Sequence, residues 1–242
     1  AVVCAVAAAP MAALHAQEAA APGAQPPSVS RLAQVVPSGH ALRALAERRF
    51  DAASGLRAST VFAMALDPAG VPWLTTDDGV FSYAGAQWRR EALPPEFERQ
   101  QVRALWLGAD GGRWMGTRNG LVYRAPDGRV LVFQERDGLA GGTVFSIIES
   151  EAVDGGPRVL VGTSRGVSRF NGSAFEPLAL PPTFSPLALM LAEGEAPDGA
   201  AELWVGSARG GVARLHRGAW RVFAAPDGLT AASVEHLVAL PG

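Results

Sequence analysis

The chain has 242 residues and a formal net charge of −2, and all of its 21 basic residues apart from histidine are arginine. The absence of lysine excludes P-loop nucleotide binding, Schiff-base catalysis and the phosphate-binding lysine of a kinase strand within this chain. The balanced charge gives no electrostatic footprint for nucleic acid, and the single cysteine, Cys4, excludes an internal disulfide.

The N-terminal residues predict an export signal. Residues 1–14 are almost all small and apolar, and Ala16 offers a cleavage site. This run is shorter than the ~20 residues that a membrane-spanning helix needs. We therefore expect residues 1–16 to be part of a signal peptide that begins before Ala1, and residues 17–47, rich in Ala, Pro and Gln, to be a linker and lead-in.

A hairpin-like sequence then recurs four times. It opens on Trp73, Trp114, Leu160 and Trp204, which are 41, 46 and 44 residues apart, and it contains Gly79, Gly120, Gly166 and Gly211, which are 41, 46 and 45 residues apart. Each copy reads as two short strands of alternating character, joined by a tight turn that requires Asn-Gly chemistry.

Further alternating runs flank each hairpin. Before the hairpins lie residues 61–66, 102–107, 144–148 and 187–191, and after them lie Trp88, residues 130–133, Phe175 and residues 220–223. Four strands in 41–46 residues are typical of a β-propeller blade. We predict an all-β fold in which residues 48–242 form propeller blades at about 59–100, 101–142, 143–184 and 185–230.

The tryptophan and glycine positions of the repeat are interpreted as structural. An aromatic side chain packs between blades, and glycine lets a neighbouring backbone approach. These structural positions are Trp73, Trp114, Gly116, Leu160, Gly162, Trp204 and Gly206.

Both ends of the repeat region predict further blades. Phe50 reads as part of a fourth strand without a hairpin before it, and residues 231–242 read as the start of a fifth blade. The four full blades are expected to belong to a ring of seven or eight.

The repeated motifs resemble the two-component-regulator propeller repeat. The match is carried by Arg113-Trp114-Met115-Gly116-Thr117-Arg118-Asn119-Gly120-Leu121 and by Asp137-Gly138-Leu139, and it covers residues 48–240. Blade 1, with Thr75 in place of the glycine, and blade 3, with Leu160 in place of the tryptophan, depart from the pattern.

The resemblance implies a periplasmic sensor domain of a receptor anchored in the inner membrane. In such receptors an immunoglobulin-like module, a membrane helix and a cytoplasmic histidine kinase, less often a diguanylate cyclase, follow the propeller. It implies that this segment is not itself an enzyme, that it uses no cofactor, and that a small molecule or glycan acts on propeller packing or on a homodimer.

The sequence offers few candidate site residues. The four histidines have no metal-ligand spacing, no nucleophile or phosphate-loop motif is present, and the frequent Asp-Gly pairs are typical of turns. We therefore predict no catalytic residues and no metal site. The hairpin turns are expected to share one face with the inter-blade loops, and they carry the candidate ligand-binding residues Asp77, Arg118, Arg165 and Arg209.

Two alternatives stay open at this point. One is an exported propeller enzyme of the lyase or quinone-dependent dehydrogenase type, although the blade motif of the quinone enzymes is absent. The other is a protein-interaction scaffold without a small-molecule ligand.

Overall fold

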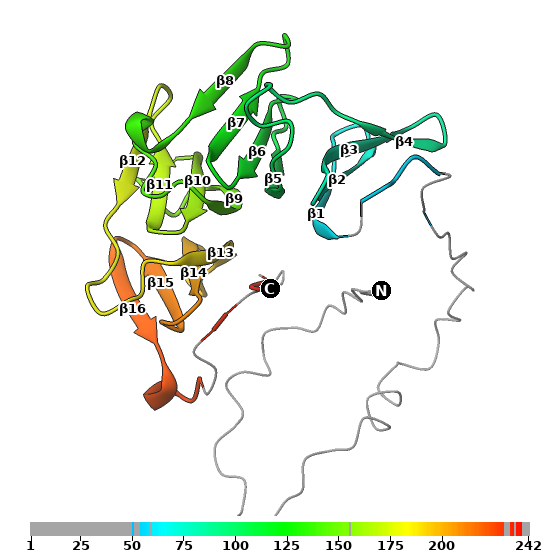
Figure 1. The fold of residues 1–242 in the computed structure, drawn as a ribbon. Coiled ribbons are helices and arrows are strands. Elements are labelled where there is room, and N and C mark those ends of the chain that lie inside the picture. Colours follow the sequence, from blue (N-terminus) through cyan, green and yellow to red (C-terminus); the bar gives the residue numbers. More distant parts are fainter. Residues whose placement is uncertain are drawn as a thin grey trace, which may run out of the picture. The chain divides into compact units, whose positions relative to one another are not determined.

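The computed structural model describes Phe50 and residues 54–58, 60–154, 156–229, 233–234 and 236–238. Its strands form four sheets, each of four antiparallel strands in chain order (Figure 1). The predicted all-β class, with four-stranded antiparallel blades, is therefore confirmed. The predicted signal peptide (1–16) and linker (17–47) lie outside the described residues. None of the helical turns in the described residues is long and apolar enough to span a membrane.

Each blade runs from an inner strand, which begins the repeat, to an outer strand. Blade 1 has β1 (Val61–Leu66), β2 (Pro72–Thr76), β3 (Gly79–Ala84) and β4 (Gln87–Arg90), and blade 2 has β5 (Val102–Leu107), β6 (Arg113–Thr117), β7 (Gly120–Arg124) and β8 (Val130–Phe133). Blade 3 has β9 (Val144–Ser150), β10 (Arg158–Thr163), β11 (Gly166–Phe170) and β12 (Phe175–Leu178), and blade 4 has β13 (Ala188–Glu195), β14 (Ala201–Ser207), β15 (Val212–His216) and β16 (Ala219–Phe223).

Single turns of 3-10 helix follow two of the outer strands. They are η4 (Glu135–Asp137) and η5 (Ala225–Asp227), and each ends at a glycine with positive φ, Gly138 or Gly228. Of the predicted start of a fifth blade, the structure describes residues 233–234 and 236–238, which form no strand. The fifth blade and the total number of blades stay predictions.

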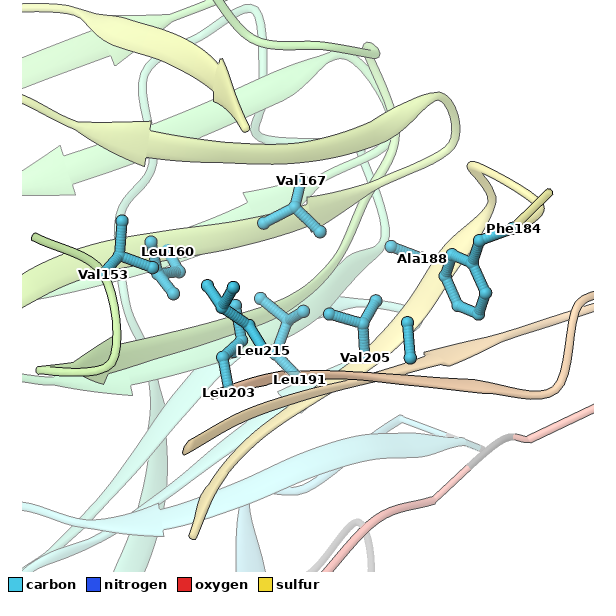
Figure 2. Packing of buried hydrophobic residues seen from close by; sticks show 10 residues of the cluster. Val153, Leu160, Val167, Phe184, Ala188, Leu191, Leu203, Val205 and Leu215 are labelled. Carbon is cyan, nitrogen blue, oxygen red and sulfur yellow. The ribbon is translucent and has the colours of Figure 1, made fainter. Parts of the chain in front are cut away.

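Consecutive blades pack against each other, and their inner strands β1, β5, β9 and β13 contact one another in that order. Three buried apolar clusters fill the three junctions. Between blades 3 and 4, Leu160 and Val167 meet Leu191, Leu203 and Val205, and all but Leu191 are fully buried (Figure 2). Each junction is thus a small hydrophobic core shared by two blades.

The inner strand of the next blade packs closely against the glycine of the Trp-x-Gly motif. A Cβ on Gly116 would lie 2.5 Å from Val144 Cγ1 and 3.0 Å from Ala104 Cβ. Because Val144 is β-branched and fully buried, it has no room to withdraw.

The same approach recurs at two further positions. A Cβ on Gly162 would lie 3.0 Å from Ala188 O, and one on Gly206 would lie 2.9 Å from Val234 Cγ1. Blade 1 has the fully buried Thr75 at this place instead. A small residue here sets the distance between neighbouring blades.

The threonine after that glycine closes the hairpin. The fully buried Thr117 donates its hydroxyl proton to Gly120 O (2.9 Å) and accepts from the Asn119 backbone N–H (3.1 Å). Thr76 and Thr163 make the same pair of bonds in blades 1 and 3. The hydroxyl therefore bridges both sides of the turn.

The hairpin turn of blade 2 lies at the predicted residues but has a different backbone conformation from the expected one. Arg118 and Asn119 form its centre, and neither has a positive φ, whereas Gly120 has φ +134° and is already the first residue of β7. The predicted two-residue turn Arg118-Asn119, followed by a glycine, is therefore confirmed, whereas the Asn-Gly chemistry expected for it is wrong because neither central residue has a positive φ. Glycine is needed at 120 because a Cβ there would lie 2.5 Å from the carbonyl oxygen of Phe133 in β8.

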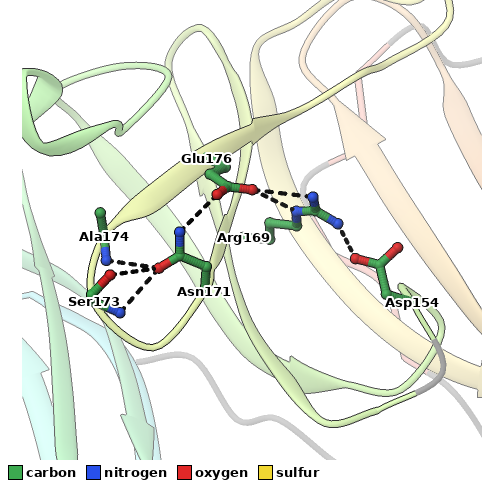
Figure 3. Close-up of polar contacts among 6 residues, drawn as sticks. All are labelled: Asp154, Arg169, Asn171, Ser173, Ala174 and Glu176. Carbon is green, nitrogen blue, oxygen red and sulfur yellow. Dashed lines mark hydrogen bonds and ion pairs between the residues drawn. The ribbon is translucent and has the colours of Figure 1, made fainter.

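The Asp-Gly pairs do form turns. Asp110, Asp127 and Asp198 each accept a hydrogen bond from the backbone N–H two residues later, and the glycine between has a positive φ. In blade 3, Asp154 and Glu176 both pair with Arg169, and Asn171 Oδ1 accepts from Ser173 and Ala174 in the β11–β12 turn (Figure 3). These carboxylates therefore stabilise turns, through backbone hydrogen bonds, and the strands of blade 3, through ion pairs with Arg169.

Candidate ligand-binding face

The turns between the second and third strands and the loops between blades lie on the same side of the sheets. Gln134 Nε2 donates to Asn119 O, and Thr143 Oγ1 donates to Arg118 O, each over 3.1 Å. The loop 134–143, which leads from blade 2 to blade 3, therefore lies directly against the hairpin turn of blade 2. We call the surface formed by turns 77–78, 118–119, 164–165 and 208–210, together with loop 134–143, the hairpin face.

Arg165 is engaged by that inter-blade loop. Its guanidinium forms an ion pair with Glu135, and its Nε donates to Ala140 O (3.2 Å). The two charged side chains are 60% and 49% exposed. An anion that binds Arg165 therefore has to compete with the Glu135 carboxylate.

Arg118 and Arg209 differ from Arg165. Both are exposed, and within the described part of the chain neither forms an ion pair. Their backbones are held, because Thr143 bonds to Arg118 O and Ser207 Oγ accepts from the Arg209 N–H (3.2 Å). They are charged side chains on fixed turns.

Asp77, the fourth candidate, has a structural contact. Its Oδ1 accepts from the Thr60 backbone N–H (3.1 Å), and its own N–H donates to Thr60 O (3.2 Å). Asp77 thus ties the blade 1 turn to the residue before β1.

A group that sequence reasoning missed lies on the inner strands. In all four blades the pairing between the first two strands slips by one residue, at Phe62, Arg103, Phe145 and Leu189. Such bulges turn a side chain out of the regular alternation of a strand. The available signal was an arginine at a repeat position that is otherwise apolar.

Arg103 is held between two aromatic rings from neighbouring blades. Its Cζ lies 5.1 Å from the centre of the Phe62 ring in β1 and 5.9 Å from that of Phe145 in β9. One amino group donates to Gln101 Oε1 (3.1 Å), and Arg103 pairs with no carboxylate in the described ranges. Since Val102 pairs with Thr117, Arg103 lies at the end of blade 2 that carries the hairpin turn.

The opposite end of blade 2 has a hollow of about 330 Å³ lined by Tyr123, Ala125, Pro126, Asp127, Arg129 and Leu131. Burial, with the nearby charges of Asp110 and Asp127, raises the pKa of the Tyr123 hydroxyl. Asp127 pairs internally with Arg129 at 2.6 Å. The hollow therefore presents a neutral phenol and an internally paired charge.

Blade 4 holds the one described histidine that lies among carboxylates. His216 Nδ1 lies 3.4 Å from Glu202 Oε1, and its Nε2 lies 3.4 Å from Asp198 Oδ2. Arg214 and Arg217 pair with the same two carboxylates, at 3.2 and 2.8 Å. Across the described residues, no group of three or more His, Cys, Asp or Glu side chains is placed to hold a metal ion.

No protein-family model matches the chain, and no curated protein matches it. Among solved structures it is similar to the extracellular domain of the hybrid two component system BT3049 from B. thetaiotaomicron, with a TM-score of 0.59 and 20% identity over 74% of this chain and 26% of that chain. It is also similar to a catalytically inactive virginiamycin B lyase from Staphylococcus aureus with quinupristin, with a TM-score of 0.51 and 13% identity over 72% of this chain and 59% of that one.

Both similarities show a shared propeller-blade fold. The chain spans about a quarter of the length of the BT3049 domain.

Proposed function

We propose that this chain is a ligand-binding sensor domain, outside the cytoplasm, of a two-component-type membrane receptor, and that it has no catalytic activity of its own. The supporting observation is the hairpin face, where charged turns are fixed by bonds to the inter-blade loop on a rigid blade scaffold. Rigid scaffolds that present variable loops on one face are the usual setting for recognition. The register of the repeat motifs and the fold shared with the BT3049 extracellular domain favour the receptor over other propeller proteins.

The ligand is a small molecule or glycan that carries negative charge. Arg118 and Arg209 supply exposed guanidinium groups, which bind carboxylates and sulfates in a bidentate manner. Arg165 joins them when an incoming anion displaces Glu135. Binding would act on blade packing or on a homodimer, and a histidine kinase or diguanylate cyclase of the receptor would report it.

A binding screen tests this proposal. The purified chain is titrated with a panel of neutral sugars, uronic acids, sulfated sugars and small organic acids, and binding is followed by thermal shift and calorimetry. We expect at least one panel member to raise the melting temperature in proportion to its concentration, as linkage requires. A panel in which no compound binds would overturn the sensor proposal.

The same panel separates a sensor from a propeller enzyme. Each bound compound is incubated with the chain and analysed by mass spectrometry. A sensor returns every ligand unchanged, whereas cleavage or elimination products would replace the sensor proposal with a lyase.

A further inference from the structure

The inner-strand bulges form a repeated row that the hairpin face does not include. The skipped residues Phe62, Arg103, Phe145 and Leu189 are 41, 42 and 44 residues apart, so each blade contributes one. Their strands β1, β5, β9 and β13 are neighbours. Three members are apolar, and the arginine stands between two of them.

Arg103 carries a charge that the described residues do not neutralise. A guanidinium has five N–H donors, and the one hydrogen bond seen here goes to the neutral Gln101 amide. Its Nε is buried without a hydrogen-bond partner. Partly burying a cation without a counter-charge is unfavourable, and the cation–π contacts with the two phenylalanine rings offset only part of that cost.

The two rings also fix the guanidinium in place. Phe62 lies 5.1 Å and Phe145 5.9 Å from its Cζ, on strands of the blades before and after. The side chain is therefore oriented before any ligand arrives, which lowers the entropic cost of binding. Apolar surface beside a fixed cation suits a ligand that combines an anionic group with a carbon ring.

We propose that Arg103, flanked by Phe62 and Phe145, is the primary anion-binding residue of this domain and that it takes a carboxylate-bearing sugar, a uronic acid. The carboxylate bonds to the amino groups of Arg103, and the sugar ring packs on the apolar row. The site lies at the end of blade 2 that also bears the Arg118 turn. This inference rests on the proposed sensor function and deepens it by naming the residue and the ligand class.

The test compares four proteins by calorimetry: the wild-type chain, Arg103→Met, Arg103→Lys and Arg129→Ala. Methionine keeps an unbranched apolar stem between the rings and removes the charge, and lysine keeps the charge without the planar fork. Arg129 is a matched control because it is 79% exposed and lies in the turn at the other end of blade 2. The probes are glucuronate, galacturonate, their methyl esters and glucose.

We expect Arg103→Met to weaken uronate binding by about tenfold or more, Arg103→Lys to weaken it less, and Arg129→Ala to leave it unchanged. The methyl esters, which have no charge, should bind no better than glucose. Thermal unfolding of each variant identifies those that retain the fold.

Two outcomes would overturn the inference and leave the sensor function standing. One is uronate binding that is unchanged in Arg103→Met. The other is equal binding of the acids and their esters. Failure of every compound of the wider panel to bind the wild-type chain would instead count against the sensor function itself.

Discussion

Val144, the first residue of β9, lies over Gly116 of the preceding blade so closely that a Cβ on Gly116 would come within 2.5 Å of its Cγ1. The contact joins a glycine of the second strand, which blades 2, 3 and 4 share, to the first residue of the next blade. It fixes how near the two sheets lie.

The first prediction concerns this contact. Gly116→Ala should destabilise the domain by about 1–3 kcal/mol, because the new methyl group overlaps a stiff, buried valine. Urea unfolding followed by tryptophan fluorescence measures the effect. Gly156→Ala is the control, since nothing lies within 4 Å of a Cβ there and its φ is not positive. Equal stability of the two variants would contradict the packing role of Gly116.

The hairpin hydroxyl gives a second prediction. Thr117→Val removes a fully buried hydroxyl and leaves Gly120 O and the Asn119 N–H without their partner. The expected loss is about 1–3 kcal/mol of unfolding free energy. Thr143→Val is the matched control, because its hydroxyl donates to Arg118 O at an exposed site, and it should change stability by less than about 0.5 kcal/mol. A larger loss in Thr143→Val than in Thr117→Val would refute this account.

The third prediction is that the domain loses stability in acid because the Asp67 carboxyl becomes protonated. Burial raises the pKa of this carboxyl, but hydrogen bonds from the Val71 N–H, Trp73 Nε1 and the Ala69 N–H, with the charge of Arg113, outweigh burial and hold the pKa below its usual 3.8. A group whose pKa is lower in the folded state stabilises above its unfolded pKa, and this contribution is lost as the pH falls through the folded value.

Asp67→Asn should therefore be less stable than wild type at neutral pH and should lose less further stability between about pH 5 and about pH 2. Denaturant unfolding at a series of pH values measures how the free energy of unfolding of each protein changes with pH. A variant that declines as steeply as wild type would show that Asp67 does not contribute to the acid response.

The ion pair on the hairpin face gives a fourth prediction. Glu135→Gln removes the carboxylate that occupies Arg165, so it should strengthen binding of acidic ligands by a few-fold, while Arg165→Ala should remove that gain. Both side chains are about half exposed, so stability should change by less than about 1 kcal/mol. Calorimetry with the uronates of the binding panel decides the matter, and an unchanged affinity in Glu135→Gln would exclude Arg165 from the site.

The strands were predictable because their causes are local. The alternating run 102–107 became β5 with the same bounds, and residues 130–133 became β8. The inner strands of blades 3 and 4 reach further, to Ser150 and Glu195. The reason for Gly120 was not predictable, because it is a close approach to Phe133 O on the adjacent strand, a contact between residues thirteen positions apart that a dipeptide rule does not contain.

The candidate site was less predictable because its contacts cross blades. The pairing of Arg165 with Glu135 joins residues 30 positions apart, and the stack of Arg103 depends on rings from both neighbouring blades. It also depends on a one-residue slip in pairing, which leaves no mark in the hydrophobic pattern of a single strand. Comparison of the four repeats identifies Arg103 as the charged residue at a position that is otherwise apolar, and the structure shows that it lies between the Phe62 and Phe145 rings.

The contact between Gly116 and Val144 is asymmetric, because the two blades contribute different residues to it. At the junctions between blades 2 and 3 and between blades 3 and 4, a glycine of one blade meets the first inner-strand residue of the next, so the two surfaces that meet are different. Such a head-to-tail contact is heterologous, and it can be repeated without a two-fold axis. A duplicated blade inserted between blades 2 and 3 would find a matching partner on both sides, so the number of units can change by recombination without the redesign of any single junction.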